Sequence, residues 1–384
     1  MSTTTGADLV YNPFSFAIQE YPYGIYARLR DEAPVYHNAD VGFFALSRYA
    51  DVLAAHLDAA TFSNRMGPTI EPRSSEIRTL LTMDPPEHGM YRRLVHRSFT
   101  PRSIAGLEPW IRDTAVSLLE EAREVGRLDA VGGYSAHFPV TVISELLGIP
   151  RDQRMVIKHL ADRVLAAEDS ETAVVPEDAM AAQVEYIGLL LEIFEYKRAH
   201  PGDDLITMML NTEVTDDDGR SFMPSDIDTA ARVLEMSLAG HETVAKLIGS
   251  GVVGLWWSPE QRRELVDDPA LIPAAVEEML RWDPPSQYQG RWCERDVEMH
   301  GTVIPAESRV ILLTGETIRT VRESVQAVPP YRRRRREWTP TWIVSKAPRR
   351  PWQSWQRCSA PLKASGGHST IHSPEARSRS RSLT

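Results

Sequence analysis

The chain has 384 residues, of which 42% are hydrophobic and 25% charged, a composition typical of a globular protein with one large domain or two average ones. Its two cysteines, Cys293 and Cys358, exclude a disulfide scaffold, argue against CxxC-type metal or redox sites, and fit a reducing cytosol. No run of about 18 apolar residues and no signal-peptide pattern occur, so we expect a cytoplasmic protein without a membrane span, and the formal charge of -10 argues against general nucleic-acid binding.

The first half of the chain has mostly helical periodicity. Apolar spacing predicts helices over residues 23–31, 49–57, 83–101, 105–122, 139–147, 154–166 and 176–199, with short extended segments at 35–36 and 43–46. The sequence Asp84-Pro85-Pro86-Glu87 predicts a helix start. In this interpretation Asp84 is the N-cap, Pro85 occupies the first helical position and Glu87 reaches back as in a capping box.

The longest predicted helix covers residues 224–257, from a cap at Ser225 or Asp226 to Ser258-Pro259. Two shorter helices follow at 259–267 and 273–282. The pattern then changes to short strands at 297–300, 302–304 and 309–313. We therefore expect a mainly α fold with small β-sheet regions.

The segment 316–384 differs from the rest of the chain. It holds 15 of the 43 basic residues but only 4 of the 53 acidic ones, has no Asp or Phe, and carries four of the nine tryptophans. Five arginines run together at residues 332–336, and no apolar period persists. We expect a truncated domain over 1–315 and a disordered or frameshifted basic tail over 316–384. A frameshift near Glu316 and a genuine basic extension both remain open.

The middle of the longest helix carries the pentapeptide Ala239-Gly240-His241-Glu242-Thr243. A central glycine weakens a helix, and the Thr243 hydroxyl can donate to the carbonyl of Ala239 four residues earlier, which bends the helix. An acid and a hydroxyl then lie beside a local groove. A helix kink with a surface acid is the alternative interpretation.

Two charged pairs have the spacing of one helix face. His88 and Arg92 are four residues apart, and two such donors suit a carboxylate or phosphate ligand, although a solvated basic face has the same pattern. Glu278 and Arg281 are three residues apart, and a solvated surface pair is again the alternative.

These motifs, over about residues 10–315, resemble those of soluble bacterial cytochromes P450, which are haem-thiolate monooxygenases. The pentapeptide is similar to the pattern (Ala/Gly)-Gly-x-(Asp/Glu)-Thr of that family's central helix. The resemblance implies that Ala239 and Gly240 line the oxygen pocket and that Glu242 and Thr243 form the proton-delivery relay.

The stretch DPPEHGMYRRLVHRSFTPR resembles the family helix whose His and Arg bind the haem propionates, which implies that role for His88 and Arg92. Arg291 resembles a further propionate-binding arginine; an ordinary strand arginine is the alternative. Glu278 and Arg281 resemble the family's structural ExxR pair, which braces the proximal side of the haem.

The family's cysteine loop, Phe-x-x-Gly-x-x-x-Cys-x-Gly, does not occur in the sequence. Its thiolate is the proximal iron ligand. Cys293 lies in the strand region and is interpreted as structural. Cys358, 77 residues after Arg281, comes roughly where the ligand is expected but lacks the flanking glycines, so it is only a weak candidate for the metal ligand.

The resemblance implies the cytochrome P450 fold with haem b (iron protoporphyrin IX) as cofactor. The implied reaction inserts one oxygen atom from O2 into an apolar organic substrate, with electrons from NAD(P)H through ferredoxin and ferredoxin reductase. Without the cysteine loop, we expect this chain to be catalytically impaired. A non-catalytic relic or partner-binding protein, and polyanion binding by the arginines at 332–336, stay open as alternatives.

Overall fold

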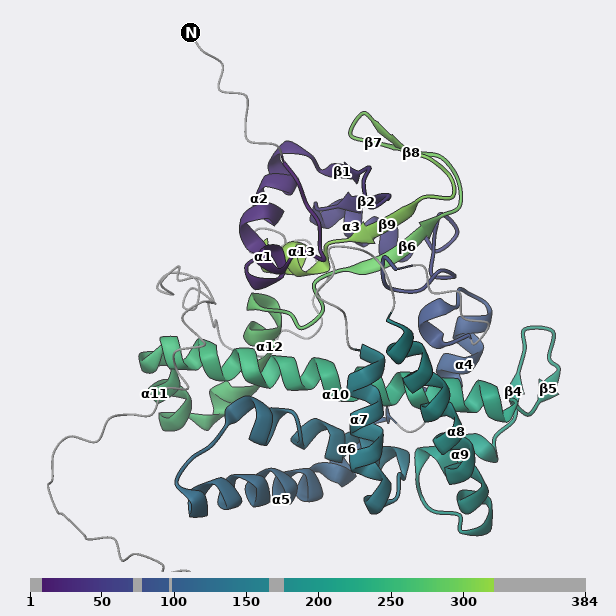
Figure 1. Ribbon diagram of the computed structural model, residues 1–384, viewed down its shortest axis with the longest axis vertical. Helices are drawn as coiled ribbons and strands as arrows, with labels where there is room; N and C mark the ends of the chain where they lie inside the picture. The colour runs from purple at the N-terminus through teal and green to yellow at the C-terminus, as the bar shows by residue number, and fades with distance from the viewer. Residues whose placement is uncertain (1–8, 72–77, 97–98, 166–175, 321–384) are drawn as a thin grey trace, which may run out of the picture. The chain divides into compact units, whose positions relative to one another are not determined.

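Helices make up most of the described residues, as the apolar spacing predicts. The computed structural model describes residues 9–71, 78–96, 99–165 and 176–320 (Figure 1). The described residues all belong to one compact unit. The α-helices are α1 (Phe16–Glu20), α2 (Tyr23–Glu32), α3 (Tyr49–Leu57), α4 (Glu87–His96), α5 (Pro101–Val125), α6 (Phe138–Leu147), α7 (Arg154–Leu165), α8 (Glu177–Ala199), α9 (Leu205–Leu210), α10 (Asp226–Trp257), α11 (Pro259–Asp267), α12 (Ile272–Trp282) and α13 (Thr314–Thr320).

A five-stranded sheet has the order β1–β2–β9–β6–β3. The hairpin of β1 (Val35–Asn38) and β2 (Phe43–Leu46) pairs through β2, in parallel, with β9 (Arg309–Leu312). The antiparallel strands β6 (Gln289–Cys293) and β3 (Phe62–Ser63) complete it. The sheet thus joins segments from opposite ends of the described chain (Figure 1). Two further hairpins are β4–β5 (Val214–Thr215, Ser221–Phe222) and β7–β8 (Val297–Met299, Thr302–Ile304).

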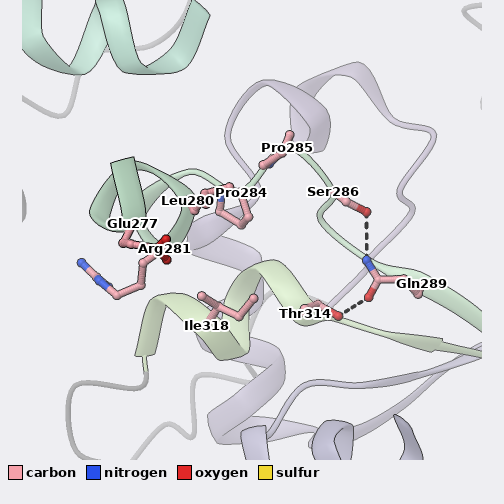
Figure 2. A pocket seen from close by; sticks show the side chains of 9 residues that line it. All are labelled: Glu277, Leu280, Arg281, Pro284, Pro285, Ser286, Gln289, Thr314 and Ile318. Atoms are coloured by element: carbon pink, nitrogen blue, oxygen red, sulfur yellow. Dashed lines mark hydrogen bonds between the residues drawn. The ribbon is translucent and has the colours of Figure 1, made fainter. Parts of the chain in front are cut away.

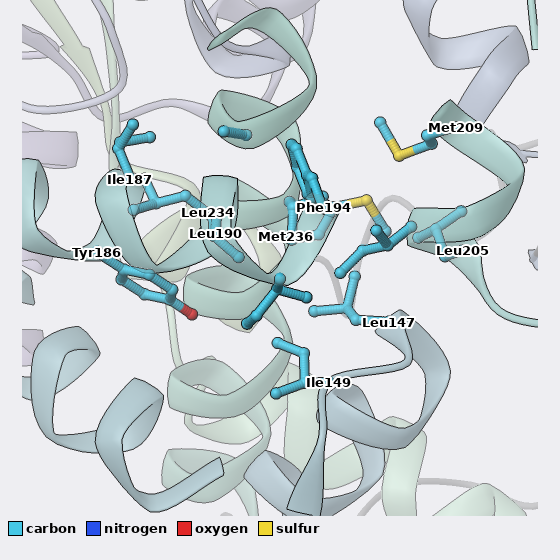
Figure 3. Close-up of a cluster of buried hydrophobic side chains, with 14 of the residues drawn as sticks. Leu147, Ile149, Tyr186, Ile187, Leu190, Phe194, Leu205, Met209, Leu234 and Met236 are labelled. Atoms are coloured by element: carbon cyan, nitrogen blue, oxygen red, sulfur yellow. The ribbon is translucent and has the colours of Figure 1, made fainter. Parts of the chain in front are cut away.

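The largest apolar core lies among the helices α4 and α6 to α10 (Figure 3). Tyr186 and Leu190 of α8 are one turn apart and fully buried, and they pack in the same cluster as Leu147 of α6. The Tyr186 hydroxyl donates to Ser237 Oγ of α10 at 2.6 Å, so burial leaves neither hydroxyl without a partner.

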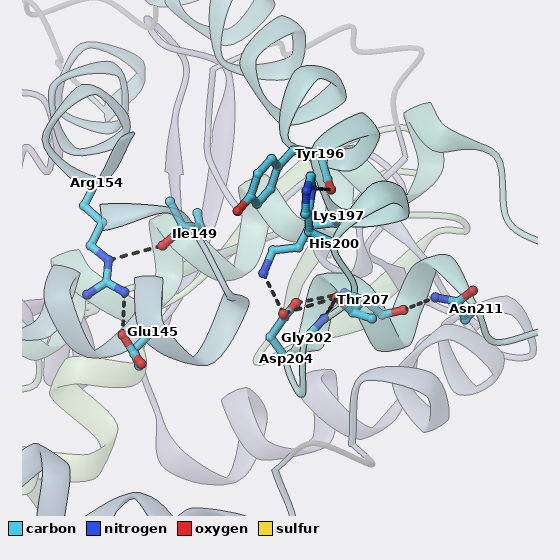
Figure 4. Close-up of polar contacts among 10 residues, drawn as sticks. All are labelled: Glu145, Ile149, Arg154, Tyr196, Lys197, His200, Gly202, Asp204, Thr207 and Asn211. Atoms are coloured by element: carbon cyan, nitrogen blue, oxygen red, sulfur yellow. Dashed lines mark hydrogen bonds and ion pairs between the residues drawn. The ribbon is translucent and has the colours of Figure 1, made fainter. Parts of the chain in front are cut away.

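Polar contacts fix the ends of the shorter helices in this region (Figure 4). Asp204 caps α9 by accepting from the Thr207 backbone N–H at 2.9 Å, and its carboxylate pairs with Lys197 of α8 at 2.6 Å. Gly148 ends α6 at φ 82°, and a Cβ there would overlap the Asp204 side chain. The glycine therefore allows α6 and the start of α9 to approach.

The mainly α fold with small sheets is confirmed, and most of the predicted helices lie within a few residues of their expected bounds. The prediction at Asp84 is wrong. Its carboxylate accepts from Ser63 Oγ, the Asn64 backbone N–H and Asn64 Nδ2, at 2.5, 2.9 and 2.6 Å, and α4 begins only at Glu87. The side chain that was expected to cap the helix instead ties it to the end of β3.

The packed part of the chain continues beyond Gly315 into α13. Glu316 is 2% exposed and forms an ion pair with Arg30 of α2, and Thr317 is equally buried. The first residues of the segment assigned to the tail thus contribute to the core. The rest of that segment, including the arginines at 332–336, lies outside the described residues.

None of the helices that the structure describes combines the length and the apolar character that a membrane crossing requires.

Candidate functional site

The pentapeptide of residues 239–243 lies in the middle of α10, as predicted. The Thr243 hydroxyl donates to the carbonyl oxygen of Ala239 at 2.8 Å, which confirms the expected bond within the helix. Ala239 is exposed and Thr243 half-buried, so this stripe of the helix is not covered by the other described elements.

Gly240 faces a neighbouring helix. A Cβ at this position would lie 2.8 Å from Ile143 Cγ1 of α6. Close packing of α6 against α10 therefore requires glycine at this position, because any side chain would push the two helices apart. The assignment of Gly240 to an oxygen pocket stays a prediction. Because glycine has no side chain, only its backbone could line such a pocket.

Glu242 lies next to Thr243 and is 35% exposed. Its Oε1 pairs with Nζ of Lys246 one turn later, at 2.8 Å. The sequence analysis did not single out Lys246, although a Lys four residues after a Glu on a helix is an ordinary signal for such a pair. The acid is thus held toward Lys246 and within reach of water, one residue before Thr243.

His241 points to the opposite side of α10 from the exposed stripe and is 3% exposed. Its Nδ1 lies 3.0 Å from the Ser237 carbonyl oxygen, which accepts and therefore places a proton on Nδ1. Nε2 lies 3.9 Å from an oxygen of Asp162 on α7. This histidine joins α10 to α7, away from the acid and the hydroxyl.

The predicted propionate-binding residues meet around Asp84. Burial lowers the pKa of His88, as does the positive charge of Arg92, whereas the Asp84 carboxylate acts in the opposite direction. Burial also lowers the pKa of Arg291 on β6, and Asp84 again opposes the shift. The structure thus places His88 of α4 and Arg291 of β6, from elements far apart in sequence, within electrostatic range of the same Asp84 carboxylate. His88 and Arg291 are partly buried, whereas Arg92 is exposed.

Asp84 can occupy this position because β3 pairs with β6. The hydrogen bonds from Ser63 and Asn64 hold its carboxylate at the end of β3, adjacent to the strand that carries Arg291. This carboxylate acts electrostatically on both His88 and Arg291.

His56 of α3 is a member of this group that the sequence analysis missed. Its Nδ1 lies 2.9 Å from Nη2 of Arg291, which can only donate, and its Nε2 lies 3.3 Å from Thr314 Oγ1. Burial lowers the pKa of His56 to about 4, and the charge of Arg291 adds to the effect. The ring is therefore neutral and orients the arginine. No local pattern marks this residue, because its partners come from β6 and α13.

Glu278 and Arg281 form a bidentate pair on α12. The distances are 2.7 Å from Nε to Oε2 and 2.6 Å from Nη2 to Oε1, and Glu278 is 4% exposed. The hydrogen bonds to Glu278 raise the pKa of Arg281. The alternative of a solvated surface pair is wrong for this chain, because one partner is buried.

A pocket of about 500 Å³ opens beside this pair (Figure 2). Thr314 and Gln289 lie at its other end, where the Thr314 hydroxyl donates to Gln289 Oε1 and Gln289 Nε2 donates to Ser286 Oγ at 2.9 Å. Through His56, Thr314 connects the pocket to Arg291.

The cysteines of the chain do not supply a metal site within the described residues. Cys293 lies on β6, is fully buried, and donates from Sγ to the Arg295 carbonyl oxygen at 3.1 Å. Burial raises the pKa of its thiol, which disfavours the thiolate that binds metals. Cys358 lies outside the described residues. No group of three His, Cys, Asp or Glu side chains in the described ranges is arranged to hold a metal ion.

No family model matches the chain, whereas individual proteins do. A protein of Mycobacterium tuberculosis named cytochrome P450 123 is 37% identical over 317 residues, which are 81% of this chain and 77% of that protein. The vitamin D(3) 25-hydroxylase of Pseudonocardia autotrophica is 36% identical over 318 residues, covering 81% and 76%. The cytochrome P450 monooxygenase PikC of Streptomyces venezuelae is 32% identical over 308 residues, covering 78% and 72%.

Solved structures agree with these relatives. Substrate-free CYP109E1 from Bacillus megaterium superposes with a TM-score of 0.70 at 27% identity, over 79% of each chain. A mutant of P450 EryK in complex with erythromycin B gives a TM-score of 0.71 at 31% identity, over 83% of this chain and 80% of that one. Both sequence and fold thus agree with the motifs on α4, α10 and α12, and the chain belongs to the cytochrome P450 family of haem-dependent monooxygenases.

Proposed function

We propose that residues 9–320 contribute the haem-binding scaffold of a cytochrome P450 that acts on an apolar organic substrate, and that this chain is impaired because its sequence lacks the family's cysteine loop. The observation that carries the proposal is the grouping of His88 and Arg291 around Asp84, with Arg92 close to His88, together with the uncovered stripe of α10 that carries Ala239 and Thr243.

The cations fit the two carboxylates of haem b. Arg291 is partly buried, keeps its charge, and is oriented by a neutral His56, so it is prepared to donate to an anion. His88 and Arg92 lie one turn apart on the same face of α4, and Asp84 acts electrostatically on His88. Haem propionates would bind to Arg291, His88 and Arg92 and take over the role that Asp84 plays in this structure.

We propose that the uncovered stripe of α10 faces the bound group. α4 contacts α10 where the Arg232 guanidinium lies 3.4 Å from the centroid of the Tyr91 ring. Arg232 is seven residues, or about two turns, before Ala239. Tyr91 is one turn after His88, so the cations of α4 and the stripe of α10 flank one region.

Haem supplies oxygen activation when it is bound, and the protein positions groups and moves protons. Glu242 is the residue that exchanges protons with water, since it is partly exposed and held by Lys246. Thr243 passes a proton from the acid toward the uncovered stripe, because its hydroxyl can rotate between donating to Ala239 and donating outward. The buried pair of Glu278 and Arg281 fixes α12 and is structural.

The described residues offer no cysteine that is suited to bind the haem iron. Cys293 is a buried thiol with a raised pKa on an internal strand, and no other described residue is a cysteine. We therefore propose that haem binds weakly and that the chain is catalytically impaired. Stoichiometric haem in the purified protein would contradict this and would also exclude a non-catalytic relic.

The substrate class and partners follow from the family. Similar proteins include a vitamin D(3) hydroxylase and a structure that holds erythromycin B, which supports a bulky, largely apolar substrate. We propose electron delivery from NAD(P)H by ferredoxin and ferredoxin reductase, and a cytoplasmic location.

The propionate-binding role is tested with a porphyrin that has no iron, so that the axial ligand does not matter. Protoporphyrin IX and its dimethyl ester are titrated into the purified chain, and porphyrin fluorescence reports binding. We expect saturable binding of the free acid, at least about tenfold tighter than that of the ester, because only the free acid pairs with the cations.

Arg291→Met should abolish that preference. Arg112→Met is the matched control, because Arg112 is an exposed arginine of α5 that pairs only with Glu108 of its own helix in the described structure. Equal affinity for acid and ester would contradict the proposal. A normal absorption band of the reduced carbon monoxide complex, at the wavelength that names the family, would contradict the impairment.

A further inference from the structure

A buried acid of α10 holds the segment that leads into α4. Glu235 is 7% exposed, and its Oε2 and Oε1 accept from the backbone N–H groups of Leu80 and Leu81, each at 2.8 Å. These two residues begin the 3₁₀ helix η1 (Leu80–Thr82). Two of the N–H groups that a helix start leaves without partners are therefore satisfied by one side chain from another element.

The surroundings of Glu235 are built for this contact. Burial raises its pKa, while the N–H groups of Leu80 and Leu81 and the charge of Arg232 oppose the shift. Arg232 is one turn earlier on α10 and 0% exposed, and its guanidinium lies over the Tyr91 ring of α4. Its Nη1 pairs with Asp228 at 3.7 Å, whereas its Nε and Nη2 have no hydrogen-bond partner among the described residues. Glu235 therefore adds to the negative charge that Asp228 supplies to this buried guanidinium.

The segment held by Glu235 is short and is fixed at its other end as well. Residues 80–82 are followed by Met83, which is 1% exposed, and by Asp84, which Ser63 and Asn64 hold at β3. α4 then begins at Glu87 and carries His88. The position of the α4 cations therefore depends on the two anchors of this segment, one on the sheet and one on α10.

Glu235 also lies on the stripe of α10 that matters for the chemistry. Ala239 and Thr243 follow it at four and eight residues, which places all three on one face within about 12 Å along the axis. We propose that Glu235 is a positioning residue that sets the distance between the cations of α4 and the acid and hydroxyl of α10. The positioning role rests on the proposed haem-binding function, whereas the contacts of Glu235 with Leu80 and Leu81 do not depend on it.

Hydrogen–deuterium exchange of the full chain tests the anchor without any ligand. Glu235→Leu removes both acceptors at similar volume, and Glu235→Gln keeps one carbonyl oxygen. We expect exchange of the Leu80 and Leu81 amides to accelerate by at least about tenfold in the Leu variant and by an intermediate factor in the Gln variant. Glu192→Gln, at an exposed position of α8, should change nothing.

Amides of the β2–β9 pair serve as an internal reference. Acceleration confined to residues 79–84 supports the positioning role. Equal acceleration in β2 and β9, or a change within about twofold at Leu80 and Leu81, overturns it. If the Leu variant does not fold, the Gln variant decides by the same comparison, because partial rescue requires a specific acceptor at this position.

Titration with protoporphyrin IX connects the anchor to the site. We expect the Leu variant to bind the porphyrin about tenfold more weakly than the wild type. Faster exchange at Leu80 and Leu81 with unchanged porphyrin affinity overturns the role of Glu235 in positioning. Failure of the wild type to bind the porphyrin rejects the haem-binding proposal instead, and the exchange data still decide whether Glu235 anchors the segment.

Discussion

The pair of Glu278 and Arg281 makes a quantitative prediction. Replacing Glu278 by Gln removes the charge of a side chain that is 4% exposed and leaves Arg281, which is 20% exposed, with at most one of two hydrogen bonds. A hydrogen bond to a charged group contributes about 1.5–3 kcal/mol, and breaking a fully buried pair costs about 3–5 kcal/mol. Because water reaches part of Arg281, we expect a loss of about 2–3 kcal/mol in the free energy of unfolding.

Urea denaturation followed by the helical circular dichroism signal measures this loss. A double-mutant cycle with Arg281→Met isolates the pair, and we expect a coupling of at least about 1.5 kcal/mol. Glu120 and Arg123 of α5 are the matched control, because they have the same spacing and a 2.5 Å contact but are 48% and 78% exposed. Glu120→Gln should cost less than about 0.5 kcal/mol. Equal costs at the two sites would refute the argument that burial makes the difference.

Three further outcomes follow from the packing and the titrating groups. Gly240→Ala should lower the free energy of unfolding by about 1–2 kcal/mol, because the new Cβ meets Ile143, and Ile143→Ala should relieve this loss. Gly188→Ala, in the open middle of α8, should instead raise the free energy of unfolding by up to about 1 kcal/mol, and thermal melts compare the variants. The pKa of His56 is about 4 in the folded chain and 6.5 in the unfolded chain, so the free energy of unfolding should fall as the pH decreases from 6.5 to 4. The urea midpoint of His56→Gln should fall less than that of the wild type over this interval, and an equal fall in both proteins would contradict the lowered pKa. A chain that ends at residue 315 should melt several degrees below one that ends at residue 320, because it lacks the buried Glu316. Equal melting temperatures of these two variants would contradict the role of Glu316.

The parts of the molecule that the sequence predicted well depend on local signals. Ser225 caps α10 through the Asp228 N–H, and Ser258-Pro259 ends it, as expected from residue types alone. The bond from Thr243 to Ala239 spans one helical turn, so the sequence contains both partners in a fixed geometry. The acid–base pair at 278 and 281 is equally local, although its burial was not predictable from spacing.

The features that were missed depend on contacts between distant segments. His56 is defined by Arg291 and Thr314, and no window of sequence includes all three. Asp84 had a good local role as a cap, but the donors at Ser63 and Asn64 outcompete the helix start for its carboxylate. The reason for Gly240 likewise comes from Ile143 on another helix. Tertiary contacts decided these positions over local preference.

The parallel pairing of β2 with β9 has a consequence for how the protein is made. Residues 43–46 leave the ribosome early, whereas their neighbours at 309–312 follow only after nearly all of the described chain has been synthesised. Until then the hairpin of β1 and β2 has an open, apolar edge, and such edges pair readily with foreign strands. The helices between them make mostly nearer contacts and can pack first. During synthesis, the edge of the nascent hairpin therefore stays unpaired until β9 emerges, and within the described residues the five-stranded sheet forms late.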